Sequence, residues 1–443
     1  MNDAAPAVLV DHLFRNRAGQ MVAYLTRLLG PQYLDLAEEA VQEALVKALQ
    51  IWPYSEIPAN PSGWLFRVAR NAALDAIRHS TLVDQNAASL AASEIAKMAP
   101  SADSSENAEF EEQLRDDELR MMLLCCHPAL PRDARVALSL RTVGGFNTRE
   151  VAKAFLSEES TIAQKLVRAK RQIRSGRITF DLPNGDELLE RLDSVLEVIY
   201  LMFNEGYAAQ SGENLVRQEL CGEALRIARL LGASSVATPE VHALIALMAF
   251  QAARLPARID SQGELVLLED QDRTAWDSRL IALGFQHFSL CADGSQLSAY
   301  HLQAGIAAAH ARAKSSADTD WEMILGLYNQ LMERCPSPVI ALNRIVAVAQ
   351  ARGTQLALSE LRDLAKENSL QNYYLLPAVE GSLLLATGDN PKASGSFRRA
   401  LALSCSEPEK RFLQRKLEQS METMPPKDSL SHVGFYQDPL LGV

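Results

Sequence analysis

Two consecutive helical segments of opposite charge, between residues 35 and 78, constrain the fold of this chain more than any other feature. The first begins at Asp35 with DLAEEAVQEA and carries an acidic, amide-bearing face. The second begins at Asn60 with NPSGWLFRVARNAALDAIR, and its exposed positions are basic. An acidic helix is complementary to a basic protein surface, and a basic helix with aromatic neighbours is complementary to nucleic acid. The pair therefore predicts a helical domain that binds a protein partner and nucleic acid together.

Length and charge limit the remaining possibilities. A chain of 443 residues is long for one core, so two to four domains are expected. The net charge of -11 and the pI near 5.4 exclude a chain that coats nucleic acid along its whole length, so DNA contacts must come from local basic patches. No apolar run approaches the ~20 residues of a membrane span, and the N-terminus does not resemble a signal peptide. We therefore expect a cytoplasmic protein without membrane contact.

The cysteines favour reduced, mostly buried thiols. The chain has six, without CxxC spacing, and the adjacent Cys125 and Cys126 are poorly placed to bridge each other. The segment Cys125-Cys126-His127 suggests a metal site, but no second ligand pair lies at zinc-site spacing. The apolar run Met121–Leu124 before it favours a core helix instead. We expect neither a metal nor a cofactor.

Composition divides the chain into four pieces, and the three outside a linker favour an all-α fold. Residues 1–80 are helical in pattern, and residues 81–112 form a flexible acidic linker. Helical periodicity returns over residues 113–177, where the stretch 132–177 carries eleven Lys/Arg against four Asp/Glu. Residues 178–443 are again helical and acidic. The main strand candidate is Glu264–Leu268, which is equally compatible with a loop.

The third piece contains a helix-turn-helix pattern. Asn147 or Thr148 can cap a first helix that runs to Phe155, and a second helix follows over Ser160–Arg174. Four apolar residues of the second helix recur at helical spacing and are expected to face the core: Ile162, Leu166, Ala169 and Ile173. The outward set combines polar and basic side chains, as a recognition helix in a DNA major groove does: Thr161, Gln164, Lys165, Arg168 and Arg171. The alternative is an ordinary helix pair with a solvated basic face.

The basic helix of the first piece has a similar division. Its expected buried stripe consists of Trp64, Leu65, Val68, Ala69, Ala72 and Ala76, and the other side carries Arg67, Arg70, Asn71, Leu74 and Arg78. The proline-bounded loop Tyr54–Asn60 before it could hold an unstacked base of single-stranded DNA. Two alternatives remain: Trp64 as an ordinary core residue, and Asn71 hydrogen-bonded to Asp75 within the domain.

The order of these elements resembles a bacterial RNA polymerase sigma factor of the extracytoplasmic-function (ECF) type. The motifs are DLAEEAVQEALVKALQ, NPSGWLFRVARNAALDAIR, an acidic linker, and TREVAKAFLSEESTIAQKLVRAKRQI. The first pair resembles region 2 and the last resembles region 4, so the resemblance covers roughly residues 10–177. The turn LSEES departs from the family because it lacks the usual glycine.

The resemblance implies roles for residues that match the family pattern. Glu39, Gln42 and Glu43 would face the clamp helices of the polymerase largest subunit, and region 4 would contact the polymerase flap. The -10 element would be opened and read by the Tyr54–Asn60 loop and by Trp64, Arg67, Arg70, Asn71 and Arg78. The -35 element would be contacted by Thr161, Gln164, Lys165, Arg168 and Arg171. The acidic linker would thread toward the RNA exit path.

The long C-terminal piece resembles a tetratricopeptide (TPR)-like extension found in one group of these sigma factors. Gly353 and Gly388 end two similar helix patterns 35 residues apart, close to the ~34-residue period of that repeat. Stacked helix pairs expose a groove suited to a protein or peptide partner. A mixed set of aromatic, amide and charged residues suggests a ligand or interdomain site: Phe203, Asn204, Glu205, Tyr207, Gln271, Asp272, Arg273 and Trp276. Alternatively, these residues cap helices and pack against each other.

Other classes of protein explain less of the chain. A helix-turn-helix regulator with a helical sensor domain, independent of core polymerase, leaves the segment 35–78 without a purpose. A pure TPR scaffold explains the C-terminal half alone. An enzyme is not expected, because the sequence shows no catalytic spacing and no phosphate-binding glycine loop. The main hypothesis is a sigma factor that is controlled by its own C-terminal extension.

Overall fold

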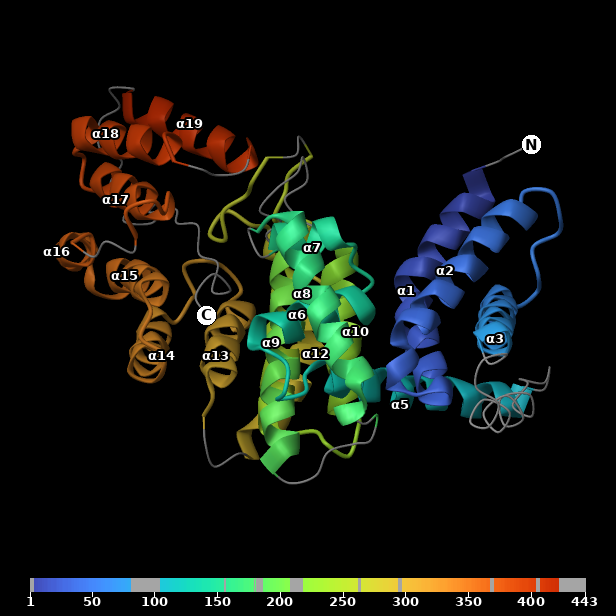
Figure 1. The fold of residues 1–443 in the computed structure, drawn as a ribbon. Helices are drawn as coiled ribbons and strands as arrows, with labels where there is room; N and C mark the ends of the chain where they lie inside the picture. The colour runs from blue at the N-terminus through green and yellow to red at the C-terminus, as the bar shows by residue number, and fades with distance from the viewer. Residues whose placement is uncertain are drawn as a thin grey trace. The chain divides into compact units, whose positions relative to one another are not determined.

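The structure, a computed structural model, describes residues 4–80, 104–154, 157–178, 180, 186–207, 218–261, 264–293, 297–366, 370–403 and 407–421. It divides into two compact units, Met1–Met202 and Phe203–Val443. Helices dominate both units (Figure 1). Residues 81–103 of the expected linker lie outside the described residues, and α5 begins at Ser104. The start of α5 therefore overlaps the last part of the expected linker, residues 104–112.

Among the described residues, the first unit opens with a bundle of four helices and one 3₁₀ turn. Its elements are α1 (Ala4–Leu29), η1 (Pro31–Tyr33), α2 (Leu34–Ile51), α3 (Pro61–Ser80) and α5 (Ser104–Cys125). Small and branched residues on α2 recur at helical spacing, and they bury its inner face against α1 and α3. The Tyr24 and Phe66 rings meet edge to face at 5.8 Å between centroids. This contact packs the inner face of α3 against α1.

A second group of short helices completes the unit: α6 (Arg132–Thr142), α7 (Thr148–Ala154), α8 (Glu159–Gln172), the π-helical turn η2 (Ile173–Arg177) and the first part of α9 (Asp186–Tyr207). The end of α5 supplies the buried run Met121–Leu124 to this core, followed by buried Cys125 and Cys126. The expected placement of this segment in a core is confirmed. Helix α5 therefore packs against both groups of helices.

The second unit is helical within its described residues. It begins with the end of α9 and continues through α10 (Gln218–Gly232), α11 (Pro239–Ala253), η3 (Leu255–Ala257), η4 (Arg273–Ala275), α12 (Ser278–Leu290), η5 (Cys291–Asp293) and α13 (Ala299–Arg312). Helix α11 is buried over most of its circumference and packs against α10, α12 and α13. The strand candidate near residue 265 amounts to one isolated bridge, between Ile259 and Leu265.

Helices then follow one another as a stack (Figure 1, orange to red). They are α14 (Trp321–Arg334), α15 (Pro338–Arg352), α16 (Thr354–Leu364), α17 (Leu375–Ala386), α18 (Asn390–Leu401) and α19 (Glu407–Met421). Each packs mainly against the next helix along the chain. Gly353 ends α15 with φ 99° and Gly388 follows α17 with φ 79°, a conformation that costs glycine little. The expected all-α fold class is confirmed.

The α17–α18 hairpin offers a matched test of this packing. A Cβ atom added at Gly381 would lie 2.8 Å from the buried Phe397 ring, whereas one at Gly395 would meet nothing within 4 Å. We predict that Gly381→Ala lowers local stability by about 1–3 kcal/mol because the ring must shift. Gly395→Ala should raise it by about 0.5–1 kcal/mol through helix propensity. Native-state hydrogen exchange of the α17 and α18 amides measures both, and equal effects would contradict the close packing.

Candidate nucleic-acid interface

Helix α7 begins with a reciprocal cap. The Glu150 backbone N–H donates to Asn147 Oδ1 at 2.9 Å, and the Asn147 backbone N–H donates to Glu150 Oε2 at 2.8 Å. This arrangement satisfies two backbone donors at the helix start. Of the two caps expected from the sequence, the structure uses Asn147. The cap fixes where α7 begins, and α7 packs against α8.

Helix α8 separates an apolar face from a polar one, as the sequence indicated. Ile162, Leu166 and Ala169 are buried, and so is Ile173 just beyond the helix. Four of the five predicted outward residues are exposed: Thr161, Gln164, Arg168 and Arg171. Lys165 differs, because its ammonium pairs with Asp133 at 2.6 Å and the side chain is only half-exposed. The free polar face of α8 is therefore narrower than the sequence suggested.

Helix α3 exposes Arg67, Asn71 and Arg78, while Arg70 is half-buried. Asn60 caps the helix by accepting the Gly63 N–H at 2.8 Å. The predicted buried stripe is confirmed only in part, because Leu65 and Ala69 are buried whereas its other four members are half-buried: Trp64, Val68, Ala72 and Ala76. Leu74 is 5 % exposed, so the expectation that it faces outward was wrong. Helix α3 packs against both α1 and α2. Its buried stripe is therefore wider than that of a helix that packs against a single neighbour.

The aromatic residues beside α3 fall into two groups. Trp64 is half-buried with its ring 5.4 Å from that of Trp52, which is itself buried. Tyr54 is 91 % exposed in the preceding loop. An exposed ring is available for stacking on a base, whereas a packed pair mainly positions the helix. Asp75 pairs with Arg78 at 3.2 Å, so this carboxylate already has a partner on its own helix.

Helix α2 presents two acidic faces. Glu39, Gln42 and Glu43 are exposed, and Glu43 pairs with Lys47 on the same helix at 2.6 Å. Asp35 and Glu38 point the other way, toward the basic end of α8 and the η2 turn. The outer face fits a basic protein surface. The inner face is already occupied within the unit.

Sequence reasoning missed how α9 packs on the α6–α8 group. Arg135 of α6 donates to the Pro128 and Leu130 carbonyls at 2.9 and 2.8 Å, and to Ser194 Oγ of α9 at 2.9 Å. Arg191 of α9 is buried, forms an ion pair with Glu187 and donates to the backbone of α5. Arg135 lies in a basic stretch and Arg191 in an acidic one, and a single arginine in either setting gives no sequence signal of burial. The first part of α9 therefore belongs with the helix-turn-helix, not with the extension.

The predicted C-terminal partner site lies largely inside the second unit and has to be corrected. Phe203, Tyr207 and Trp276 are buried. The Arg258 guanidinium lies 3.8 Å from the Tyr207 ring centroid, and Arg254 and Arg273 both lie over Trp276. Cation–π contacts of this kind hold helices together in a core. These aromatic residues pack the fold and are not a free surface.

The polar members of that set are divided. Gln271 is buried and donates to the Val266 carbonyl at 3.1 Å. Asp272 is exposed and caps η4, because its side chain accepts the Thr274 N–H at 2.9 Å. Asn204 is half-buried, and the Glu205 side chain lies outside the described residues. The alternative that these residues cap helices and pack together fits the described ones.

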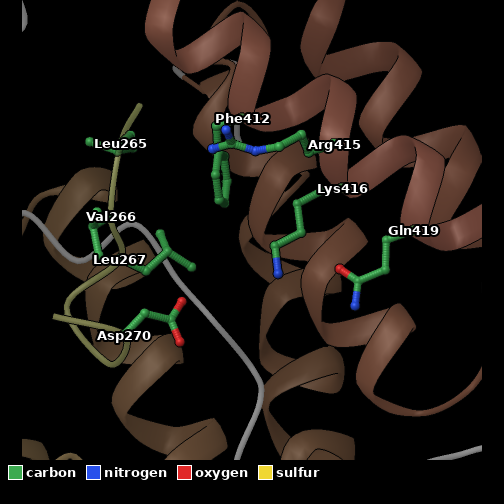
Figure 2. Close-up of a pocket in the computed structure, with 8 residues that line it drawn as sticks. All are labelled: Leu265, Val266, Leu267, Asp270, Phe412, Arg415, Lys416 and Gln419. Carbon is green, nitrogen blue, oxygen red and sulfur yellow. The ribbon is translucent and has the colours of Figure 1, made fainter. Parts of the chain in front are cut away.

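A cavity of 320 Å³ lies in the second unit, between the loop Leu265–Asp270 and α19 (Figure 2). Leu265 and Phe412 contribute apolar surface to it, and Lys416 and Asp270 contribute charges. Burial lowers the pKa of Lys416, and burial raises the pKa of the neighbouring Glu269 to about 7. The cavity thus combines an apolar wall with a half-buried amine.

The described part of the chain shows neither a metal-binding cluster nor a membrane-spanning helix. Burial raises the pKa of the Cys126 thiol to about 12 and holds the pKa of the Cys125 thiol well above its ordinary value, so neither thiol is poised to ionise. No cluster of three or more His, Cys, Asp or Glu side chains within the described ranges could hold an ion. Among the helices described, none has the length and apolarity that a bilayer crossing requires.

Comparison with known proteins assigns the two helical groups of the first unit. Residues 13–82 match the model of sigma-70 region 2, and residues 120–173 match that of sigma-70 region 4. The chain belongs to the sigma-70 family. It is a factor of transcription initiation, and its sigma domains imply binding to core RNA polymerase and promoter DNA. Region 2 corresponds to α1–α3, and region 4 runs from the end of α5 to the start of η2.

The remainder of the chain has relatives without an assigned function. Residues 191–292 match a family of unknown function, DUF6596. An uncharacterized protein of Rhizobium meliloti (strain 1021) is 38 % identical over 386 residues, which cover 87 % of this chain and 90 % of that protein. The similarity therefore covers most of the chain and is not confined to the sigma regions. No solved structure matches.

The packing of α9 on region 4 can be tested with two arginines of α6. We predict that Arg135→Ala lowers the stability of region 4 by about 2–3 kcal/mol, because it leaves two partly buried carbonyl groups without their charged donor. Arg132→Ala removes an exposed ion pair with Glu197 and should cost less than about 1 kcal/mol. Hydrogen-exchange protection of the Met121–Leu124 amides reports both effects. Similar losses for the two variants would contradict a structural role of α9 in region 4.

Proposed function

We propose that this sigma factor is of the ECF type and that its two sigma regions read a promoter with -10 and -35 elements. The observation that carries the proposal is the exposed polar and basic face of α8, set on a buried apolar stripe and a capped α7. Polar residues near the helix start suit base edges, and the cations behind them suit phosphates. The residues proposed to contact the -35 element are Thr161, Gln164, Arg168 and Arg171, with Lys165 at the margin because Asp133 holds it.

Region 2 is proposed to supply both polymerase docking and -10 recognition. The exposed residues Glu39, Gln42 and Glu43 of α2 would dock on the clamp helices of the largest subunit. On α3, Arg67, Asn71 and Arg78 are exposed and Arg70 is half-exposed, so this face suits the DNA backbone and an opened strand. The exposed Tyr54 ring supports stacking on an unpaired base in the loop before α3. Trp64 would position this helix through its packing on Trp52.

The extension is proposed to control the sigma regions through a protein or peptide partner. Its successive helix pairs, with left-handed glycines after α15 and α17, support a TPR-like stack. The cavity beside α19 supplies a second surface that a small molecule or a side chain of a partner would fit. The aromatic set near Tyr207 is not part of this proposal, because it is buried.

In vitro transcription with core RNA polymerase and a genomic promoter library tests the main proposal. We expect initiation at a defined promoter class only when the chain is added. At those promoters, Gln164→Ala should cost about 1–3 kcal/mol of discrimination at the base that it contacts. Arg171→Ala should weaken all promoters similarly and reduce the salt slope of binding by about one.

Arg132→Ala provides the charge-matched control, since it removes one exposed cation of region 4 away from α8. It should leave promoter choice unchanged. If the chain supports no initiation that depends on core polymerase, the proposal is contradicted, and a DNA-binding regulator independent of polymerase is favoured instead. Equal effects of the control and of Arg171→Ala would remove α8 as the reading helix.

Control by the extension is tested by comparing the full chain with a chain that ends at residue 202, the boundary between the units. An end at residue 177 is unsuitable, because it removes the part of α9 that packs on region 4. We expect the rate of promoter-dependent initiation to differ at least about fivefold between the two forms, the lower end of typical coupling between sites. Hydrogen exchange should show region 4 equally folded in both. Identical rates would contradict a regulatory role.

A further inference from the structure

Two arginine side chains lie against the buried Trp276 ring in the second unit. The guanidinium carbons of Arg254 and Arg273 are 5.7 and 5.2 Å from the centroid of that ring. Arg254 is 6 % exposed, and Arg273 is half-buried. Cation–π attraction accounts for part of this arrangement. It leaves open which group compensates two positive charges that are held beside one ring.

The acceptors of the two guanidinium groups are neutral. Arg254 donates to Gln251 Oε1 at 3.0 Å. Arg273 donates to the backbone carbonyl oxygen of His310 at 2.8 Å and to the Thr319 hydroxyl at 3.2 Å. No carboxylate of a described residue forms an ion pair with either group. Neutral oxygens orient a guanidinium but compensate its charge only in part, and a buried charge without a counter-charge is costly.

Three buried nitrogen atoms beside these cations have no hydrogen-bond partner among the described residues. They are Trp276 Nε1, Gln251 Nε2 and His310 Nδ1. The three side chains are 6 %, 1 % and 4 % exposed. The indole and amide nitrogens can only donate, and a buried donor without an acceptor destabilises the fold. An acceptor, and not a further donor, would complete this group of side chains.

These groups come from separate elements and act on one another. Arg254 ends α11, Trp276 follows η4, and His310 lies near the end of α13. Burial lowers the pKa of His310 to about 3, and both guanidinium groups add to this effect, so the imidazole is neutral. Burial also lowers the pKa of Arg273, as does Arg254, and the exposed Asp318 opposes this without forming an ion pair. The interior here is therefore positive in charge.

We propose that Arg254, Arg273 and the Trp276 indole form a binding site for a small oxyanion, either a carboxylate or a phosphate. An oxyanion compensates both guanidinium charges and accepts from the indole and amide N–H groups, whereas water brings no charge. The guanidinium fork matches the oxygens of both kinds of anion. Because Arg273 is half-buried, the site is open to solvent on that side. This site goes beyond the proposed control of the extension by a protein or peptide partner.

The site is tested in the full chain labelled with 5-fluorotryptophan, in which four tryptophans give four fluorine signals. Trp276→Phe assigns the signal of the site. Sodium phosphate and sodium acetate are titrated separately, with sodium chloride at the same ionic strength as the reference. We expect phosphate or acetate to shift the Trp276 signal saturably, while the signals of Trp52 and Trp64 in the first unit stay in place. The anion that produces the shift identifies the class of ligand.

Gln251→Glu places a carboxylate beside Arg254 with almost no change of shape. In chloride alone it should raise the melting temperature by at least about 2 °C, because it supplies the negative charge itself. It should weaken the response to the anion at least about tenfold, since two like charges so close repel each other. Arg362→Gln changes the net charge of the second unit by the same amount at an exposed position of α16. This control should change the anion affinity less than about twofold.

Each outcome decides for or against the site. If neither anion shifts the Trp276 signal more than chloride does, the site is overturned and water alone satisfies the donors. A response that Gln251→Glu leaves unchanged, or that Arg362→Gln weakens equally, would place anion binding elsewhere. A lower melting temperature of Gln251→Glu would contradict the need for negative charge. None of these measurements involves DNA or polymerase, so a failed anion site leaves the proposed promoter reading untouched, and the reverse also holds.

Discussion

Helix α5 belongs to two cores at once, and the arrangement of the sigma regions depends on how it seats on α1. Gln20 donates to Glu118 at 3.0 Å and Arg27 pairs with Asp117 at 2.7 Å, with both acids almost fully buried. Burial raises the pKa of Asp117 from 3.8 to about 6, against the opposing effect of Arg27. Its contribution to stability is therefore present below pH 3.8 and is lost as the pH rises through 6. Near neutral pH these pairs fix the position of α5 more than they stabilise it, and the apolar run Met121–Leu124 stabilises the far end.

The acidic residues of α2 lie on two faces of the helix, and the two faces have different surroundings. On α2, the outer face (Glu39, Gln42 and Glu43) stays in solvent, while Asp35 and Glu38 neutralise the end of a basic helix. Region 4 does the same, since Lys165 is held by Asp133 of its own α6. The local excess of positive charge is thus partly compensated in the free protein. What remains exposed on α8 is a narrow polar and basic stripe, which suits a specific contact better than a general affinity for nucleic acid.

Sequence periodicity predicted those features that depend on a single helix. The stripe of α8 from Ile162 to Ile173 is buried as expected, because four apolar positions at helical spacing leave only one face for the core. Features that depend on packing against two or more helices were not predicted from the sequence. Leu74 is buried because α3 packs on two helices. Trp276 is buried with the guanidinium groups of Arg254 and Arg273 over its ring, a contact that helical periodicity does not predict. The packing of α9 on region 4 depends on Arg135 and Arg191, whose residue type indicates a surface. Only the tertiary structure reveals that Arg191 is buried and Arg135 half-buried.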